Sequence, residues 1–311
     1  MKRWFCNLRL QWKFFVILLF SLLLVFVGAM TTSRMTEQAY TDALYERTMQ
    51  LLMLFGQSVQ AELDDVADVS FSILADNVLQ EKLSESIRSQ DDYAARIETK
   101  NEISKRLTNM SFYRSDITSL RLRAYDQTFF TSTLTGITVP TELFDLYEQE
   151  IHEAKGRAIW VPDETATGSL FLFRDVREVK DLTLNSIATL GMRVSMDRIV
   201  ENCVEPLAQM NMPLLCAIDF QGHRVYAADD RLLNLNGDAE TYSLRELEGE
   251  TYFCAVHTPA GSQWTYTAAL PYGEILQSLR SASSTAAVIA AVALVLALLF
   301  EIGRTVPSFA S

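Results

Sequence analysis

Leu52–Ile73 has the sequence LMLFGQSVQAELDDVADVSFSI, and this stretch predicts a long amphipathic helix. Its apolar side chains recur at steps of three and four residues, which places them on one face of a helix. They are Leu52, Phe55, Val59, Leu63, Val66, Val69 and Ile73. Asp64, Asp65 and Asp68 fall beside or opposite this stripe, and we expect a solvated face there and no cation site. With one Gly and no Pro, Thr36 to about Ser86 is expected to be helical, and a continuous helix of this length would extend roughly 75 Å.

A second helix is predicted downstream at Asp92–Met110, so that long helices occupy residues 36–110. The residues expected to face inward from it are Ile97, Ile103, Leu107 and Met110.

The pattern then changes to the alternation that is typical of strands. In Ser119–Tyr125 the residues Leu120, Leu122 and Ala124 point one way, and Arg121, Arg123 and Tyr125 point the other. Further strands are predicted at 129–132, 158–161, 169–179 and 187–195. A helix from Pro140 to about Lys155, with Gly156 at its C-cap, and a helix beginning at Asp197 complete a module of about 112–210.

A second module of similar plan is predicted at about 212–271. Its strands are expected at 214–219, 224–227, 251–257 and 263–270, with turns at Gln221-Gly222 and at Pro259-Ala260-Gly261. The fold class is therefore α+β, with two antiparallel sheets following a long N-terminal helix.

Two uncharged, mostly apolar runs flank these modules, at Phe14–Ser33 and Ser281–Phe300. Each has about the 20 residues that a helix needs to cross a bilayer. We therefore expect transmembrane helices at 14–33 and 281–302, with the lipid bilayer as a partner. The alternative for the first run is a cleaved signal peptide, because Val27-Gly28-Ala29 supplies small residues near its end.

The basic residues before the first run set the expected orientation. Lys2, Arg3, Arg9 and Lys13 precede it without an acidic residue, which holds this end in the cytoplasm. The expected arrangement is a cytoplasmic N-terminus (1–13), an extracytoplasmic domain (34–280) and a cytoplasmic tail (303–311) of a two-pass plasma-membrane protein.

Composition excludes several classes of function. The chain has 27 Lys and Arg against 39 Asp and Glu, a net charge of −12, which argues against nucleic acid as a partner. Its four cysteines lie at spacings that suit neither a disulfide framework nor a metal site, and buried free thiols are expected. The three histidines are scattered, and no hydrolase, phosphate-loop or metalloprotease motif occurs. We expect no catalytic residues, no metal and no cofactor.

Several stretches in this order resemble the double-Cache sensor region of bacterial two-component sensor histidine kinases of the YesM-like group. The resemblance covers Phe14 to about Pro307. It is found in Ile73–Gln80, in Trp160 with Leu170–Val176, in Leu190–Asp197, in Ile218–Tyr226 and in Trp264 with Leu270-Pro271.

The resemblance implies two PAS-like sheets stacked along a long N-terminal helix, the first module being membrane-distal and the second membrane-proximal. It implies a small-molecule ligand in the distal module and a signal passed through the second transmembrane helix. Arg304–Pro307 resembles the beginning of a HAMP linker, after which the HAMP and kinase domains of relatives are missing. Signalling would then need a homodimer or a heterodimer with a sensor kinase. The alternative is a non-catalytic membrane interaction protein or a truncated fragment of a sensor histidine kinase.

Five residues are candidates for ligand contact. Arg174 shares a strand face with Leu170, Leu172 and Val176, so its guanidinium is expected to enter an apolar layer and to need an anionic partner. That partner is either a ligand carboxylate or a protein acid such as Asp126 or Asp163. The other candidates are Arg123, Tyr125, Trp160 and Asp175, as the lining of a pocket for a small polar molecule. The Tyr/Arg/Trp/Tyr/Asp pattern of amino-acid-binding relatives is absent.

Overall fold

The computed structural model describes residues 10–88, 93–178, 185–208, 215–233, 242–273 and 292. The chain divides into two units. One comprises residues 1–48, 244–253 and 271–311, and the other, larger one comprises residues 49–243 and 254–270. The sites described below all lie in the larger unit.

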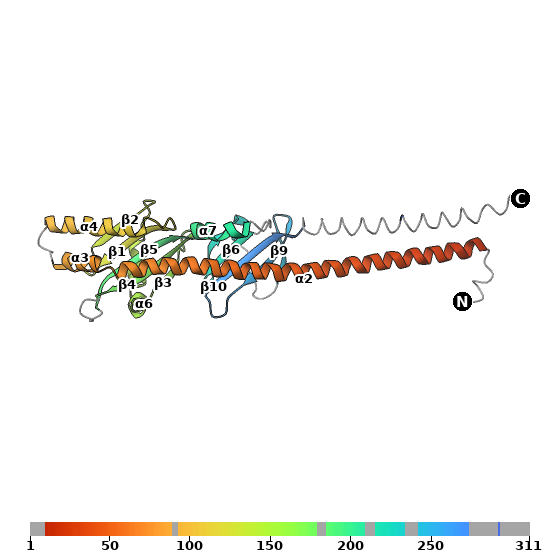
Figure 1. Cartoon of the computed structure of the whole chain (residues 1–311), viewed down its shortest axis with the longest axis horizontal. Helices are drawn as coiled ribbons and strands as arrows, with labels where there is room; N and C mark the ends of the chain where they lie inside the picture. The colour runs from red at the N-terminus through yellow and green to blue at the C-terminus, as the bar shows by residue number, and fades with distance from the viewer. Residues whose placement is uncertain are drawn as a thin grey trace. The chain divides into compact units, whose positions relative to one another are not determined.

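The element order is that of a helical segment followed by two sheet modules (Figure 1). The helices are α2 (Leu10–Leu74), α3 (Asn77–Arg88), α4 (Tyr93–Ser111), α5 (Thr141–Leu146), α6 (Glu148–Glu153) and α7 (Met196–Ala208), with a short 3-10 helix at Asp230–Leu232. The strands are β1 (Ile117–Ala124), β2 (Phe129–Thr133), β3 (Ile159–Pro162), β4 (Ser169–Arg177), β5 (Ser186–Ser195), β6 (Leu215–Phe220), β7 (His223–Ala227), β8 (Ser243–Leu247), β9 (Glu250–His257) and β10 (Trp264–Pro271).

The two sheets have the same topology. The first has the strand order β2-β1-β5-β4-β3 and the second β7-β6-β10-β9-β8, so adding five to each strand number converts one into the other. The pairs of known register are antiparallel. This confirms the prediction of two similar antiparallel modules. Strand β8 was not predicted, because its residues Ser243–Leu247 are mostly exposed and lack the alternation of a half-buried strand.

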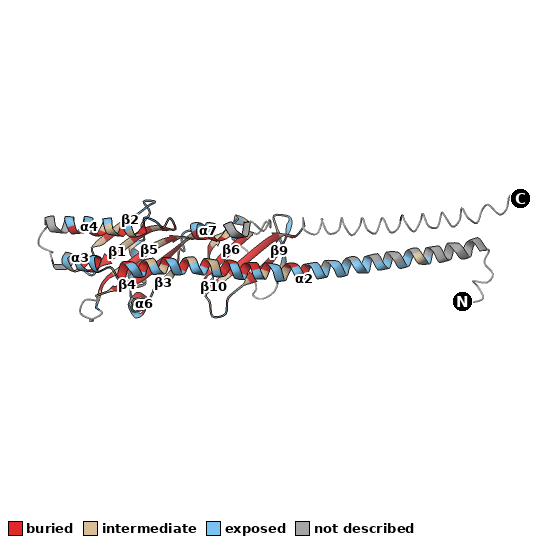
Figure 2. Ribbon diagram, in the orientation of Figure 1, coloured by how far each residue is buried: buried red, intermediate tan, exposed pale blue. Residues whose placement is uncertain are grey.

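The stripe on α2 is confirmed as the core-facing side of the helix. Leu52, Phe55, Val59, Leu63, Val66 and Ile73 are buried, and Asp64, Asp65 and Asp68 are exposed (Figure 2). In the second sheet the ring of Tyr266 packs edge-on against Phe55, with 6.1 Å between ring centroids. A Cβ at Gly56 would lie 2.9 Å from Cε2 of Tyr266, so this glycine permits the close approach of helix and sheet.

The helical stretch predicted over 36–86 is not continuous, because α2 ends at Leu74 and α3 begins at Asn77. Asp76 lies at the break, where its Oδ1 accepts from the main-chain N–H of Leu79 (2.8 Å), as an N-cap residue does. The guanidinium of Arg106 on α4 donates to both Asp76 oxygens (2.7–3.0 Å). Burial alone would raise the pKa of Asp76, but these hydrogen bonds outweigh it and hold the pKa below its usual value.

Two further helical predictions need correction. The helix expected from Pro140 to about Lys155 is two short helices, α5 and α6, which meet at Tyr147. Gly156 follows them with φ of +85°, as expected for a residue that ends a helix. Ile97 on α4 is exposed, whereas Ile103 and Leu107 are buried as predicted.

The membrane spans remain a prediction. Within the part of the chain that the structure describes, no helix meets the length and hydropathy that a membrane span requires. The first apolar run, Phe14–Ser33, lies in α2. The second, Ser281–Phe300, lies outside the described residues apart from Val292, as do residues 1–9 and the tail after Phe300.

Candidate functional site

One face of the first sheet gathers charged and aromatic side chains under α5 and α6. The strand register places three rows of residues on it. They are Ser119–Arg193–Phe171, Arg121–Gly191–Phe173 and Arg123–Thr189–Asp175, each read from β1 through β5 to β4. Because side chains alternate along a strand, these nine residues share one face, which we call the α5–α6 face. The opposite face packs against α2.

Aromatic side chains fill the middle of the α5–α6 face. The ring of Phe144 on α5 meets Phe173 edge-on (centroids 5.2 Å apart) and Phe129 edge-on (5.6 Å). Phe144 is fully buried and belongs to a cluster with Val139, Ile151, Val161, Phe171 and Phe173. A Cβ at Gly191 would lie 2.7 Å from Cζ of Phe144. The Phe144 ring of α5 therefore occupies the space that Gly191 leaves open in β5.

Arg123 attaches α5 and α6 to the sheet. It is buried, with only 5 % of its side chain exposed, and its Nη1 donates to Asp145 (2.6 Å). A second contact joins Nη2 to Glu148 at 3.5 Å, and Nη2 also donates to the carbonyl of Phe144 (3.3 Å). Both carboxylates are mostly solvent-exposed. Salt can therefore screen the ion pairs of Arg123 only from the side of the two carboxylates, where solvent reaches them.

Arg121 is less completely satisfied than its neighbour. Its Nη1 donates to the carbonyl of Val139 (2.6 Å), and its guanidinium carbon lies 4.1 Å from the centroid of the Phe129 ring. Burial lowers its pKa, an effect that the nearby Glu142 opposes. Its Nε is buried and has no hydrogen-bond partner among the described residues, and the same holds for Oγ of Ser119. Two unpartnered polar atoms thus lie two residues apart on β1, with alternation placing both on the α5–α6 face.

Asp175 lies at the edge of the same face and is fully buried. Its carboxylate accepts from Nε of Arg177 (2.7 Å) and from Oγ of Ser186 (2.6 Å). Nδ1 of His152 on α6 lies 3.6 Å away. The Asp175 carboxylate can be fully buried here because the positive charge of Arg177 neutralises it.

The five predicted site residues are divided by the sheet. Arg123 and Asp175 lie in the same row of the α5–α6 face, whereas Arg174 and Trp160 belong to the face that packs against α2. Tyr125 follows the end of β1 and is 77 % exposed.

Arg174 enters an apolar layer, as predicted, but its acceptors are main-chain carbonyls. Nη1 donates to Gly156 (2.9 Å) and Nη2 to Ala67 on α2 (3.1 Å), with the ring of Phe71 nearby. Its Nε is buried and has no hydrogen-bond partner among the described residues. Burial lowers the pKa of Arg174, and Asp68 opposes this. Neither acid that was suggested as its partner is bound to it, since Asp126 bonds Thr128 and Asp163 pairs with Arg193.

The predicted site residues did not include Ser119, Arg121, Gly191 and Phe144. A signal existed for Gly191, because a glycine inside a strand often marks a close approach by another group. Alternation had already placed Arg121 beside Arg123. Nothing in the sequence indicates that Phe144 would cover this face.

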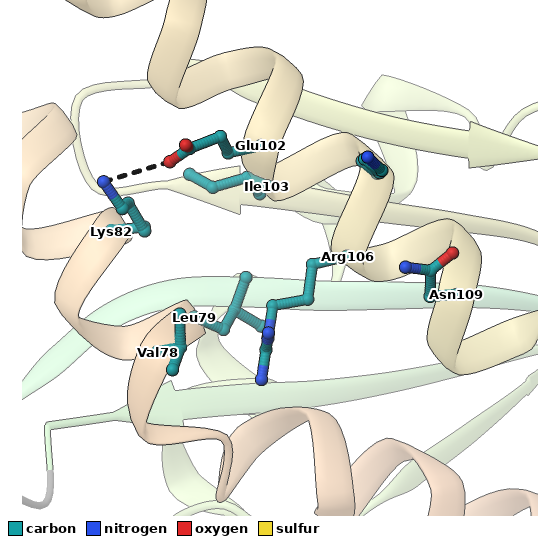
Figure 3. Close-up of a pocket in the computed structure, with 8 residues that line it drawn as sticks. Val78, Leu79, Lys82, Glu102, Ile103, Arg106 and Asn109 are labelled. Atoms are coloured by element: carbon teal, nitrogen blue, oxygen red, sulfur yellow. Dashed lines mark ion pairs between the residues drawn. The ribbon is translucent and has the colours of Figure 1, made fainter.

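A groove between α3 and α4 is a second candidate site. Its volume is about 390 Å³, and its lining residues are Val78, Leu79, Lys82, Glu102, Ile103, Lys105, Arg106 and Asn109. Figure 3 shows Lys82 of α3 reaching across to Glu102 of α4, and their charged groups are 3.0 Å apart. Hydrogen bonds to Glu102 and Glu85 raise the pKa of Lys82.

The described residues offer no metal site, since no group of three or more potential ligands occurs among them. The cysteines that the structure describes are buried thiols, as expected: Cys203, Cys216 and Cys254. Burial raises the pKa of Cys216 to about 12, so it stays protonated at neutral pH.

Comparison with known proteins agrees with this architecture. The sensor histidine kinase YesM of Bacillus subtilis (strain 168) is 20 % identical over 288 residues, covering 89 % of this chain. The ligand-binding domain of the Campylobacter jejuni chemoreceptor Tlp3, solved with 4-methylisoleucine, superposes with a TM-score of 0.51 and 12 % identity. That match covers 74 % of this chain and 91 % of the other.

The chain has a double-Cache-like fold. Its long N-terminal helix and its two sheets of identical strand order are the elements that the resemblance implied. No protein-family model matches this double-Cache-like chain. It spans about half (48 %) of the length of YesM.

Proposed function

We propose that the chain is the extracytoplasmic sensor part of a membrane receptor, and that the α5–α6 face of its first sheet binds a small ligand. The double-Cache-like fold and the similarity to the sensor kinase YesM support this function. In the proposal, helices at 14–33 and 281–302 anchor the sensor in the plasma membrane. The second of them passes the signal to a partner sensor kinase.

The observation that carries the proposed site is the pair of unpartnered polar atoms on β1. Buried polar groups in folded proteins nearly always have a hydrogen-bond partner, so each exception needs an explanation. Nε of Arg121 and Oγ of Ser119 would both be satisfied by an anionic ligand group between them. A guanidinium suits a carboxylate well, because its fork offers parallel N–H donors. We therefore propose a small carboxylate as the ligand.

Aromatic residues support an apolar body for the same ligand. Phe171, Phe173 and Phe129 line the face on either side of Arg121. The ring of Phe144 occupies the middle, so ligand entry would require α5 and α6 to move away from the sheet. In this movement Arg123 would lose its ion pairs with the two solvent-exposed carboxylates of Asp145 and Glu148.

This movement would connect binding with signalling. A ligand that fits only the opened form shifts the equilibrium by its difference in affinity for the two forms. To shift the ratio of the two forms from 1:99 to 99:1, the ligand must bind the opened form about 10⁴-fold more tightly, a difference of roughly 5.5 kcal/mol. Two or three charge-assisted hydrogen bonds and an apolar contact reach this range, at about 1.5–3 kcal/mol for each such bond.

Ligand-induced thermal stabilisation of the full chain, purified in detergent, tests the proposal. The panel would hold amino acids, dicarboxylates and short-chain carboxylates, each beside its amide. We expect saturable stabilisation by at least one carboxylate, and Arg121→Met should reduce its affinity by about tenfold or more, since such a bond contributes about 1.5–3 kcal/mol.

Arg174→Met is the matched control for this experiment. It also removes a buried guanidinium from the first sheet, but on the face that packs against α2. The proposed site predicts that Arg174→Met lowers stability and leaves ligand affinity unchanged. Equal loss of affinity in both variants, or no stabilisation by any carboxylate, would overturn the assignment to the α5–α6 face.

A further inference from the structure

The groove between α3 and α4 has a lining whose charge is opposite to that of the chain. Three cations, Lys82, Lys105 and Arg106, face one acid, Glu102. The chain as a whole has a net charge of −12. Lys82 and Arg106 also pair with Glu85 and Asp76, so the attraction for an anion comes mainly from Lys105, which no acid among the described residues neutralises.

Three donors in the groove are not committed to a protein partner. Lys82 is bound to Glu85 and Glu102, both at 3.0 Å. Arg106 engages Asp76 through Nε and Nη2 only, which leaves Nη1 available. Within the described ranges no ion pair or hydrogen bond is formed by Nζ of Lys105 or by the amide of Asn109.

These donors lie together because of their spacing on α4. Asn109 follows Arg106 by three residues and Lys105 by four, and these are the spacings at which side chains are neighbours on a helix. Figure 3 shows Arg106 and Asn109 of α4 on one side of the groove and Val78 and Leu79 of α3 on the other.

The floor of the groove is apolar. Leu79 and Ile103 are buried, with 0 % and 1 % of their surface exposed, and Val78 is 46 % exposed beside them. A volume of about 390 Å³ falls within the usual range of small-molecule sites, about 300–1,000 Å³. Polar donors above an apolar floor suit a ligand with one charged end and a short hydrocarbon chain.

We propose that the α3–α4 groove is a second binding site, which takes a small carboxylate with a short aliphatic chain. The carboxylate accepts from Lys105, from Nη1 of Arg106 and from Asn109, and the chain lies on Leu79 and Ile103. This site is separate from the α5–α6 face, and it does not depend on the function proposed above.

Hexanoate is the probe, and hexan-1-ol, which has the same chain without the charge, is its control. Binding to the full chain in detergent is measured by calorimetry, and the site is located through the methyl NMR signals of Ile103 and Leu79. We expect saturable binding of hexanoate with shifts of both methyl signals, and much weaker binding of hexan-1-ol.

Lys105→Gln should weaken hexanoate binding at least about fivefold, because it removes a charge-assisted hydrogen bond. Lys100→Gln, which removes a cation from the same helix outside the groove, should leave binding unchanged. Arg121→Met separates the two sites, since it alters only the α5–α6 face. Absence of saturable binding, equal binding of hexan-1-ol, or loss of binding in Arg121→Met but not in Lys105→Gln would each overturn the second site.

Discussion

Gly191 and Phe144 should be energetically coupled, because the ring occupies the place that a side chain at position 191 would take. A Cβ built on Gly191 lies 2.7 Å from Cζ of Phe144, 3.0 Å from Cε1 of Phe173 and 3.2 Å from Cγ1 of Val139. Real Cβ contacts are essentially never closer than 3.0 Å. Gly191→Ala must therefore displace the Phe144 ring, and overpacking of this kind destabilises by about 1–3 kcal/mol.

Phe144→Ala acts on the same space in the opposite way. It removes a fully buried ring and leaves a cavity, with an expected loss of about 3–5 kcal/mol. In the double variant the new methyl group of residue 191 enters that cavity. We expect the double variant to be more stable than the sum of the single effects implies, by about 1–2 kcal/mol. Phe173 and Val139 limit the gain, because their contacts with the new methyl group remain close.

Urea unfolding of the full chain in detergent measures this coupling, followed by far-UV circular dichroism and by tryptophan fluorescence. The denaturant slope must stay constant across the four proteins for the free energies to be comparable. Tyr266→Phe in the second sheet is the control partner for Gly191→Ala, and that pair should be additive. Additive free energies for Gly191→Ala with Phe144→Ala would refute the packing argument.

Three further outcomes are expected. Asp76→Asn should destabilise the chain at pH 7, because the Asp76 carboxylate held by Arg106 stabilises the fold only while it is ionised. The difference in stability from the wild type should shrink as pH falls below about 4 and vanish below the lowered pKa of Asp76, and thermal melts from pH 2 to 7 measure this. Gly56→Ala should destabilise by about 1–3 kcal/mol, since its Cβ would meet the Tyr266 ring at 2.9 Å, and Tyr266→Leu in the same background should restore part of the loss in urea unfolding. Arg174→Met should remove a buried donor from two main-chain carbonyls and lower the melting temperature, whereas an unchanged melting temperature would show that water replaces both bonds.

The architecture could be predicted because it depends on periodicity. The stripe from Leu52 to Ile73 results from burial of one face of the helix, and the structure confirms it. The alternation in Ser119–Tyr125 separates an apolar from a polar face of β1, although the structure covers both faces of this strand. The break at Asp76 was missed because no Gly or Pro marks it. A capping side chain and a long-range contact from Arg106 make it instead. β8 was missed because an exposed edge strand has little hydrophobic pattern.

The candidate site was only partly predictable, for a reason that Arg174 and Arg121 illustrate. Each lies on a strand of the same sheet, and alternation correctly separates their faces. Alternation does not tell which face receives α2 and which receives α5 and α6. A buried arginine was expected to need an anion, but both Nη atoms of Arg174 donate to carbonyls, those of Gly156 and Ala67, and the second lies 107 residues away in the sequence.

The same physical rule, applied with the structure, favours the other arginine. Two carbonyls accept from both Nη atoms of Arg174, in a layer that α2 closes. Its Nε is also buried without a partner, but no second unpartnered side-chain atom lies beside it among the described residues. Arg121 has one such carbonyl, an unpartnered Nε, and the unpartnered hydroxyl of Ser119 two residues away. A single buried orphan atom is a small defect that folded proteins tolerate, whereas two neighbouring orphans on one face need a common explanation. An anionic ligand group is the explanation that satisfies both at once, and Arg121→Met is the substitution that separates it from a structural role.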